Sequence, residues 1–179
     1  MPGKRSKDAG TRSDPSSGRG KIRIMVVDDH PIVRCGVAEL VHRNPELTLA
    51  GESANTPEAL QICARLRPDL VIVDISLHGG SGLELIRELK SRDPDRPILA
   101  LSIHDEFLYA ERALRAGARG YVMKHDPIET LLRAICRVHA GEIHVSEKMA
   151  ARMIEKMTGA CPTMHNPLEP LSDRELEVF

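Results

Sequence analysis

Short apolar runs alternate with longer amphipathic stretches between residues 21 and 140. In the longer stretches the apolar positions recur at helical spacing, whereas the short runs are rich in Val, Ile and Leu. This alternation is typical of βαβ units, in which helices cover a parallel sheet. It predicts strands at 22–27, 47–52, 70–73, 98–101 and 119–123, and helices at 32–43, 56–66, 82–90, 106–116 and 127–140.

Residues at the predicted helix ends support these boundaries. Asn55 is a suitable cap for the second helix, with Pro57 in its first turn. Gly117 stands where a left-handed residue would end the fourth helix. A further helix is expected at 146–157, capped by Ser146, with an apolar stripe that packs against the main domain or a dimer mate. The stripe contains Met149, Met153 and Met157.

The chain is long enough for one domain of ordinary size with additional segments. The alternating pattern defines the domain at 21–140. Residues 1–20 are rich in Gly, Ser, Pro and charge, which predicts a disordered leader, and they lack the apolar segment of a signal peptide. Residues 141–170 form a predicted linker that contains the further helix. Residues 171–179 begin another amphipathic helix that stops within its second turn, which predicts a truncated second domain.

Composition excludes several classes of function. The longest apolar runs are only a few residues, so no membrane span is expected. A formal charge of −1 argues against a broad nucleic-acid-binding surface. Scattered cysteines without a C-x-x-C pair favour reduced thiols in a cytoplasmic protein over a disulfide or zinc framework. No histidines have metal-ligand spacing, and six are expected at the surface: His42, His78, His125, His139, His144 and His165.

Polar residues follow four of the five predicted strands. Asp28 and Asp29 follow the first, Asp74 the third, Ser102 the fourth and Lys124 the fifth. Because like ends of parallel strands share one edge of a sheet, these side chains are expected to meet in the crevice where ligands bind. Asp74 ends an almost purely apolar strand, where a carboxylate is costly unless a partner compensates it.

Three carboxylates, a hydroxyl and an ammonium suit a divalent cation and a phosphoryl group. The carboxylates repel one another unless a cation intervenes, and Mg²⁺ prefers oxygen ligands. Asp74 is then the candidate nucleophile for an aspartyl phosphate. Lys124 would balance the phosphoryl charge, and the Ser102 hydroxyl would donate a hydrogen bond to it. Each residue alone has an ordinary role in a turn, at the surface or as a helix cap, so the prediction rests on the joint pattern.

The motifs around these residues resemble those of response-regulator receiver domains of two-component signalling, specifically the branch with a LuxR-type helix-turn-helix output domain (NarL/FixJ). The resemblance is continuous over residues 21–157, and 171–179 resembles the start of that output domain, truncated here. It implies an α/β fold: a flavodoxin-like, doubly wound five-stranded parallel sheet in the order 2-1-3-4-5, with helices on both faces and a C-terminal linker helix. The matching segments are Val26-Val27-Asp28-Asp29-His30-Pro31, Val71-Ile72-Val73-Asp74-Ile75-Ser76-Leu77, Leu99-Ala100-Leu101-Ser102 and Ala116-Gly117-Ala118-Arg119-Gly120-Tyr121-Val122-Met123-Lys124.

The resemblance also implies roles for individual residues. Asp74 would accept a phosphoryl group from the phosphohistidine of a sensor histidine kinase. Asp28, Asp29 and Asp74 would hold Mg²⁺, together with the backbone carbonyl of Ser76. Lys124 would pair with the phosphoryl group. The protein would catalyse only its own phosphorylation and dephosphorylation.

Signalling would follow from a change of shape. The resemblance implies that Ser102 is the switch hydroxyl, drawn inward on phosphorylation, and that Tyr121 is the aromatic residue that follows it. The surface of the fourth helix, fifth strand and fifth helix would then report the signal, with a phosphorylated homodimer as one outcome. DNA would be bound only through the missing output domain.

The sequence departs from the family pattern after Asp74. The segment Leu77-His78-Gly79-Gly80-Ser81-Gly82 lacks the usual Met-Pro-Gly-like turn, which predicts a more mobile loop. His104, two residues after Ser102, is expected to affect how fast water reaches the acyl phosphate.

Three alternatives are weaker. A Mg²⁺-dependent phosphohydrolase of the haloacid-dehalogenase type requires Asp-x-Asp after the first strand, where this chain has adjacent Asp28-Asp29. A degenerate receiver acting only as a binding module would not need the full set of site residues. A flavin-binding domain of similar topology requires a Ser/Thr-rich phosphate loop after the first strand, which is absent from this sequence.

Overall fold

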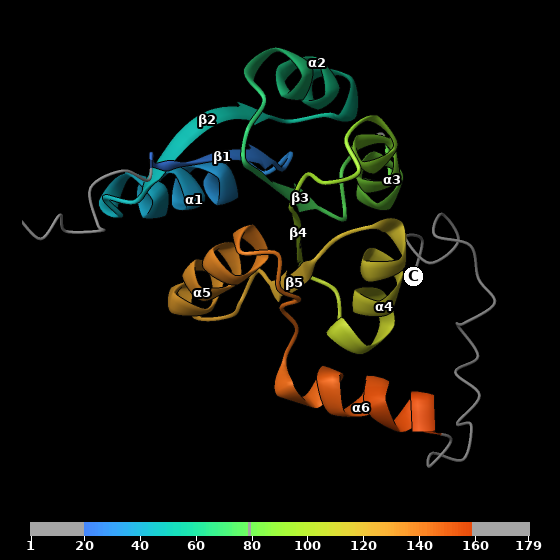
Figure 1. Cartoon of the computed structure of the whole chain (residues 1–179). Coiled ribbons are helices and arrows are strands. Elements are labelled where there is room, and N and C mark those ends of the chain that lie inside the picture. Colours follow the sequence, from blue (N-terminus) through green and yellow to red (C-terminus); the bar gives the residue numbers. More distant parts are fainter. Residues whose placement is uncertain (1–19, 79, 159–179) are drawn as a thin grey trace, which may run out of the picture.

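The structure is a computed structural model that describes residues 20–78 and 80–158. Five parallel strands form one sheet in the order β2-β1-β3-β4-β5, which confirms the expected topology (Figure 1). The strands are β1 (Ile22–Val27), β2 (Leu47–Ser53), β3 (Leu70–Asp74), β4 (Ile98–Ser102) and β5 (Gly120–Met123). The helices are α1 (Pro31–Arg43), α2 (Thr56–Leu66), α3 (Gly82–Arg92), α4 (Glu106–Ala116), α5 (Ile128–His139) and α6 (Glu147–Thr158).

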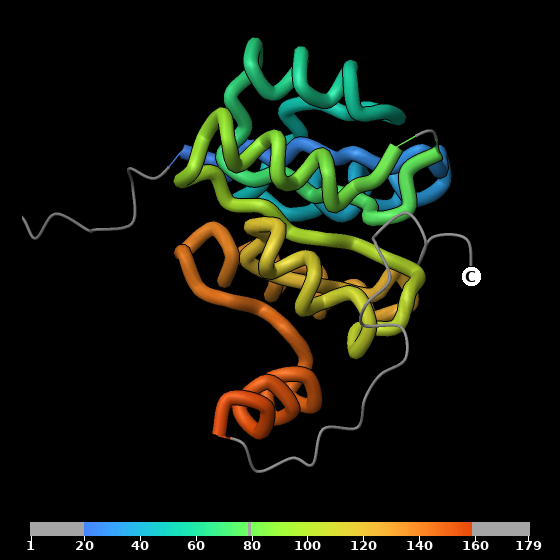
Figure 2. Tube along the Cα trace, turned by 90° about the vertical axis from the view of Figure 1, so that its right-hand side faces the viewer, coloured from blue at the N-terminus to red at the C-terminus, as the bar shows by residue number. Residues whose placement is uncertain are grey.

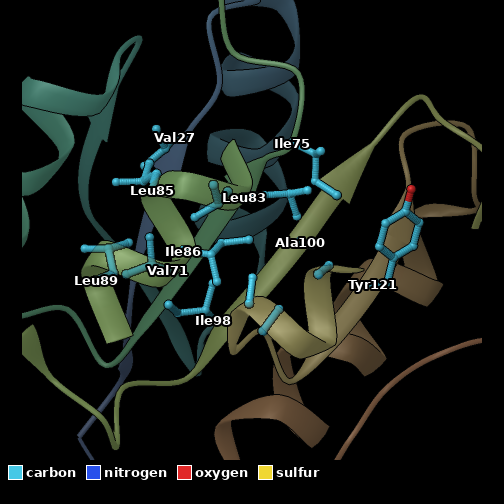
Figure 3. Close-up of a cluster of buried hydrophobic side chains, with 14 of the residues drawn as sticks. Val27, Val71, Ile75, Leu83, Leu85, Ile86, Leu89, Ile98, Ala100 and Tyr121 are labelled. Atoms are coloured by element: carbon cyan, nitrogen blue, oxygen red, sulfur yellow. The ribbon is translucent and has the colours of Figure 1, made fainter. Parts of the chain in front are cut away.

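Helices cover both faces of the sheet. α1 and α5 lie on one face, and α2, α3 and α4 lie on the other (Figure 1). The α2–α3–α4 face buries a cluster that includes Ile86, Ile98 and Tyr121 (Figure 3). The opposite face buries a second cluster that includes Val37 and Ile135. Every residue of β3 is buried because this central strand is covered on both sides.

Local chemistry accounts for the ends of the elements. The side chain of Asn55 accepts a hydrogen bond from the Glu58 N–H at 3.0 Å, so the predicted cap of α2 is confirmed. Gly117 has φ +112°, the left-handed conformation expected after α4. β3 and β4 extend by one residue beyond the predicted apolar runs, so Asp74 and Ser102 are the last residues of their strands.

The segment between α5 and α6 pairs with the outer edge of β5. His144 N–H donates to Arg119 O and Tyr121 N–H donates to His144 O, both at 2.9 Å, which forms an isolated parallel bridge opposite Gly120. His144 is therefore buried, with 8% of its surface exposed. The expectation that His144 lies at the surface was wrong, because this pairing joins residues more than 20 positions apart and no local pattern signals it.

α6 packs on α4 at the β5 end of the molecule (Figure 2). Met149 is buried against the α4 side of the core and Met153 is partly buried, so the predicted packing of the stripe on the main domain is confirmed for these residues. Met157 is 87% exposed and does not share this contact. Ser146 Oγ accepts a hydrogen bond from Met149 N–H at 3.1 Å, as expected of the cap. Its own N–H donates to the buried Glu106 carboxylate at 2.8 Å.

Several expectations lie outside the described residues: the leader up to residue 19, the linker beyond residue 158 and the helix at 171–179. The domain boundaries stay predictions. Among the helices of residues 20–78 and 80–158, none has the length and apolar character needed to cross a bilayer.

Candidate functional site

The polar residues at the strand ends meet at one edge of the sheet. Asp28 and Asp74 are fully buried, and the side chain of Lys124 is 9% exposed. Lys124 Nζ lies 2.7 Å from Asp74 Oδ2 and 2.8 Å from Asp28 Oδ2, so the ammonium joins the ends of β1, β3 and β5. The structure thus brings these predicted site residues together.

Asp74 is held by contacts to both carboxylate oxygens. Oδ1 accepts the Ser76 N–H at 3.0 Å, and Oδ2 accepts a hydrogen bond from Lys124 Nζ. Burial raises the pKa of the Asp74 carboxyl above its usual value, and the neighbouring Asp28 acts in the same direction. The Lys124 and Ser76 hydrogen bonds oppose this shift. The carboxylate is therefore desolvated and held in one orientation, which suits a nucleophile.

The end of β1 is fixed by backbone and side-chain contacts of Asp28. Its Oδ1 accepts the His30 N–H at 2.8 Å, and its backbone carbonyl accepts Arg34 Nη1 at 2.6 Å. Its own N–H donates to Ser53 O at 3.1 Å on β2. These bonds hold the turn into α1 and direct the carboxylate toward Asp74.

The carboxylates fit a divalent cation. Asp28, Asp29, His30 and Asp74 each offer one ligand atom, and these atoms all lie within 4.8 Å of one another. Asp28 Oδ2 and Asp29 Oδ1 are buried and accept no aligned hydrogen bond among the described residues. The Lys124 ammonium near Asp28 Oδ2 makes an ion pair there without hydrogen-bond alignment. Oxygens of this kind are the ligands that Mg²⁺ prefers. That the Ser76 carbonyl is also a ligand of Mg²⁺ stays a prediction.

A chain of hydrogen bonds leads from the pocket to the core of the α4 face. Ser102 is fully buried, and its Oγ accepts the His104 N–H at 3.0 Å. The Tyr121 hydroxyl donates to His104 O at 2.9 Å, and burial raises the pKa of Tyr121 far above its usual value. The His104 ring stacks on Tyr109 with centroids 4.5 Å apart. Ser102 and Tyr121 are thus connected through the backbone of His104.

A glycine allows α3 to begin beside the pocket. The Gly82 N–H donates to Ile75 O at 2.9 Å, and a Cβ at this position would lie 2.0 Å from Asp74 O. No side chain larger than hydrogen fits unless the backbone moves. Gly82 therefore sets how closely the start of α3 approaches the end of β3.

Sequence reasoning missed two histidines at this site. His30 Nδ1 lies 2.9 Å from Asp29 Oδ1 and 3.2 Å from Asp28 Oδ1. His78 is exposed, as expected, but its Nδ1 contacts Asp29 Oδ2, and the two imidazole rings lie 5.9 Å apart. The available signals were the position of His30 directly after Asp28-Asp29, and the replacement of the usual turn after Asp74 by a segment containing His78.

Comparison with known proteins agrees with this geometry. A family model for the response regulator receiver domain matches residues 24–136. The chain belongs to this family. Among curated relatives, this receiver is 36% identical to the DNA-binding transcriptional activator DevR/DosR of Mycobacterium tuberculosis, over 86% of this chain and 70% of the relative. It is 30% identical to the nitrate/nitrite response regulator NarL of Escherichia coli, over 87% and 72% of the respective chains.

A solved structure extends this agreement to the fold. The crystal structure of a LuxR-family two-component response regulator from an Aurantimonas species superposes on the receiver with a TM-score of 0.72. The sequences are 35% identical, and the match covers 78% of this chain and 99% of the other. These relatives place the chain among the two-component response regulators and not among phosphohydrolases or flavin-binding domains.

Proposed function

We propose that Asp74 of this receiver takes a phosphoryl group from the phosphohistidine of a sensor kinase, and that the resulting change of shape controls a transcriptional output domain. The observation that carries the proposal is the fully buried Asp74 carboxylate, held by Lys124 at the carboxyl edge of the sheet. The name of the relative DevR/DosR, a DNA-binding transcriptional activator, supports the link to transcription.

In the transfer step an oxygen of Asp74 attacks the phosphorus atom. The P–O bond forms as the P–N bond of the phosphohistidine breaks, and the electron pair of that bond leaves with the imidazole. Lys124 stays close enough to balance the charge of the incoming phosphoryl oxygens. Mg²⁺, held by the aspartates and the Ser76 carbonyl, would supply positive charge to the phosphoryl oxygens. We infer that the receiver catalyses only this transfer and the later hydrolysis of the aspartyl phosphate.

The switch follows from the hydroxyl of Ser102. When Ser102 Oγ turns to a phosphoryl oxygen, it no longer accepts the His104 N–H. The His104 backbone is then free to move, and Tyr121 moves with it because its hydroxyl is bonded to the His104 carbonyl. The change reaches the start of α4, and from there the new surface would favour a homodimer of the phosphorylated receiver.

The test is intact-mass spectrometry after incubation with acetyl phosphate, with and without Mg²⁺. The wild-type chain should gain one phosphoryl group only when Mg²⁺ is present. Asp74→Asn should gain none, whereas Asp95→Asn, a change at an exposed carboxylate, should behave as wild type. Full phosphoryl uptake by Asp74→Asn would show that Asp74 is not the phosphorylated residue. Sedimentation of the phosphorylated chain then tests the homodimer.

A further inference from the structure

We propose that the same pocket accepts a divalent transition-metal ion of the Zn²⁺ class, with His30 and His78 as nitrogen ligands beside the aspartates, and that this ion blocks phosphorylation. The binding half of the inference stands on the residues alone. The blocking half rests on the proposed function of Asp74.

His30 already occupies a ligand position. Its Nδ1 lies 2.9 Å from Asp29 Oδ1, 3.2 Å from Asp28 Oδ1 and 3.9 Å from Asp74 Oδ2. Ligand atoms bonded at about 2.1 Å to a common cation lie roughly 3.0 to 3.5 Å apart in octahedral or tetrahedral geometry. The spacing around His30 Nδ1 falls close to this range. A cation among these atoms would therefore need only small side-chain movements.

His78 approaches the same carboxylate from the opposite loop. Its Nδ1 contacts Asp29 Oδ2, and its backbone N–H lies 3.4 Å from that oxygen. The rings of His30 and His78 are inclined by 59° with centroids 5.9 Å apart, so two imidazoles converge on Asp29. The side chain of His78 is 82% exposed, which leaves it free to turn onto a bound ion.

The buried carboxylate oxygens are independent evidence that the pocket suits a cation. Asp28 Oδ2 and Asp29 Oδ1 have no aligned donor among residues 20–78 and 80–158, and the side chain of Asp28 is only 1% exposed. One ammonium, that of Lys124, faces the buried pair Asp28 and Asp74. A buried carboxylate without a full set of donors is costly, and a metal ion removes that cost.

The imidazoles change which metal the pocket prefers. Mg²⁺ selects oxygen ligands and retains several waters, whereas imidazole suits Zn²⁺, Ni²⁺ and Co²⁺. Two imidazoles and two carboxylates, that of Asp74 among them, would provide the four ligands that close a Zn²⁺ site, with no position left open. A closed site offers no place for a phosphoryl oxygen, and it occupies the Asp74 carboxylate. The ion would therefore inhibit phosphorylation of Asp74.

The binding test uses Co²⁺ as the probe, because its visible absorption reports nitrogen ligands and coordination geometry without any reaction. The full chain should bind one Co²⁺ with a spectrum that Zn²⁺ abolishes. His78→Ala and His30→Ala should each weaken Co²⁺ binding by at least about tenfold, since loss of even a supporting contact to a ligand has that effect. His42→Ala, at an exposed histidine of α1, should not change it. His78 lies in an exposed loop, so its variant tests the inference even if His30→Ala unfolds. Unchanged Co²⁺ affinity in His78→Ala would overturn the site.

The regulatory test measures phosphorylation by acetyl phosphate at fixed Mg²⁺ with increasing Zn²⁺. Zn²⁺ should inhibit the wild-type chain, and the half-inhibiting concentration should rise about tenfold in His78→Ala. Equal inhibition by Zn²⁺ of the wild-type chain and of His78→Ala would refute the inhibitory role of the metal ion. Lack of phosphoryl uptake in Mg²⁺ alone would instead count against the function proposed for Asp74, while the Co²⁺ result would still decide the metal site.

Discussion

Lys124 Nζ lies 2.7 Å from Asp74 Oδ2, although 50 positions separate the two residues in the chain. Asp74 ends β3 and Lys124 directly follows β5, and these two strands are not neighbours because β4 lies between them in the sheet. The ion pair therefore spans the carboxyl edge over an intervening strand. Since Asp74 is fully buried and the Lys124 side chain is only 9% exposed, each charge makes the desolvation of the other tolerable.

Removal of the Lys124 ammonium should destabilise the metal-free receiver. Lys124→Ala leaves two buried carboxylates without their cation, and a broken buried pair costs about 3 kcal/mol in the free energy of unfolding. Mg²⁺ should reduce this loss because it compensates the same charge. Urea denaturation with EDTA and with Mg²⁺ measures both effects. Lys148→Ala, at an exposed lysine of α6, is the control and should change stability little.

Two glycines should respond in opposite ways to the same substitution. Gly82→Ala forces a methyl group against Asp74 O, so the free energy of unfolding should fall by about 3 kcal/mol or more. The variant should also be phosphorylated slowly, because the end of β3 moves. Gly36→Ala, in the interior of α1 with no atom within 4 Å of the new Cβ, should gain up to about 1 kcal/mol. Equal effects of the two changes in urea denaturation would refute the close approach at Gly82.

The stability of the receiver should depend on pH through His144. Burial, together with Arg137 and Arg133, lowers the pKa of His144 below 6.5, while Glu106 and Asp126 oppose this shift. Below pH 6.5 the unfolded chain binds a proton that the folded chain excludes, so the folded state loses stability as the pH falls toward the lowered pKa.

His144→Gln should remove this part of the pH dependence, which amounts to at most about 1.4 kcal/mol per pH unit. Thermal or urea denaturation between about pH 7.5 and pH 5.5 measures it. His139→Gln, at an exposed histidine of α5, should retain the wild-type slope. A variant slope identical to wild type at position 144 would show that another group titrates.

The contact from Glu106 to Ser146 should hold α6 in place. Glu106→Ala removes the acceptor of the Ser146 N–H, and the loss should resemble that of a helix cap, about 1 kcal/mol. Amides of α6 should then exchange hydrogen faster, with little change in β3. Glu147→Ala, at an exposed residue of the same helix, is the matched control. Unchanged exchange in α6 would mean that its other contacts, namely Met149 packing, the Lys156–Glu111 ion pair and the Arg152 contact with Phe107, hold the helix without this bond.

The sheet edge was predictable because strand ends are encoded locally. The apolar runs that end at Asp28 and Asp74 fix both the strand and the point where it stops, and parallel pairing brings those points together. The histidines were not predictable in the same way. His78 belongs to a loop, where no periodicity determines the direction of a side chain, and its contact with Asp29 joins positions 49 apart.

The burial of His144 had a similar cause. Its segment has no strand pattern, and it is buried only because the backbone of Arg119 and Tyr121 offers unpaired groups beside it. Glu106 likewise reads as an ordinary first-turn acid of α4, and its contact with Ser146 depends on how α6 returns to the domain. Contacts between residues far apart in the chain leave no local sequence pattern, so they become apparent only in the folded structure.

The bridge at Gly120 should protect the receiver against aggregation through edge-to-edge strand pairing. β5 is the last strand of the sheet, and an uncovered edge strand is a template for pairing with another molecule. His144 satisfies the Tyr121 N–H and occupies the position where a foreign strand would begin to pair. A chain shortened to end before His144 would expose that edge, and we expect it to aggregate more readily even though its phosphorylation pocket is intact.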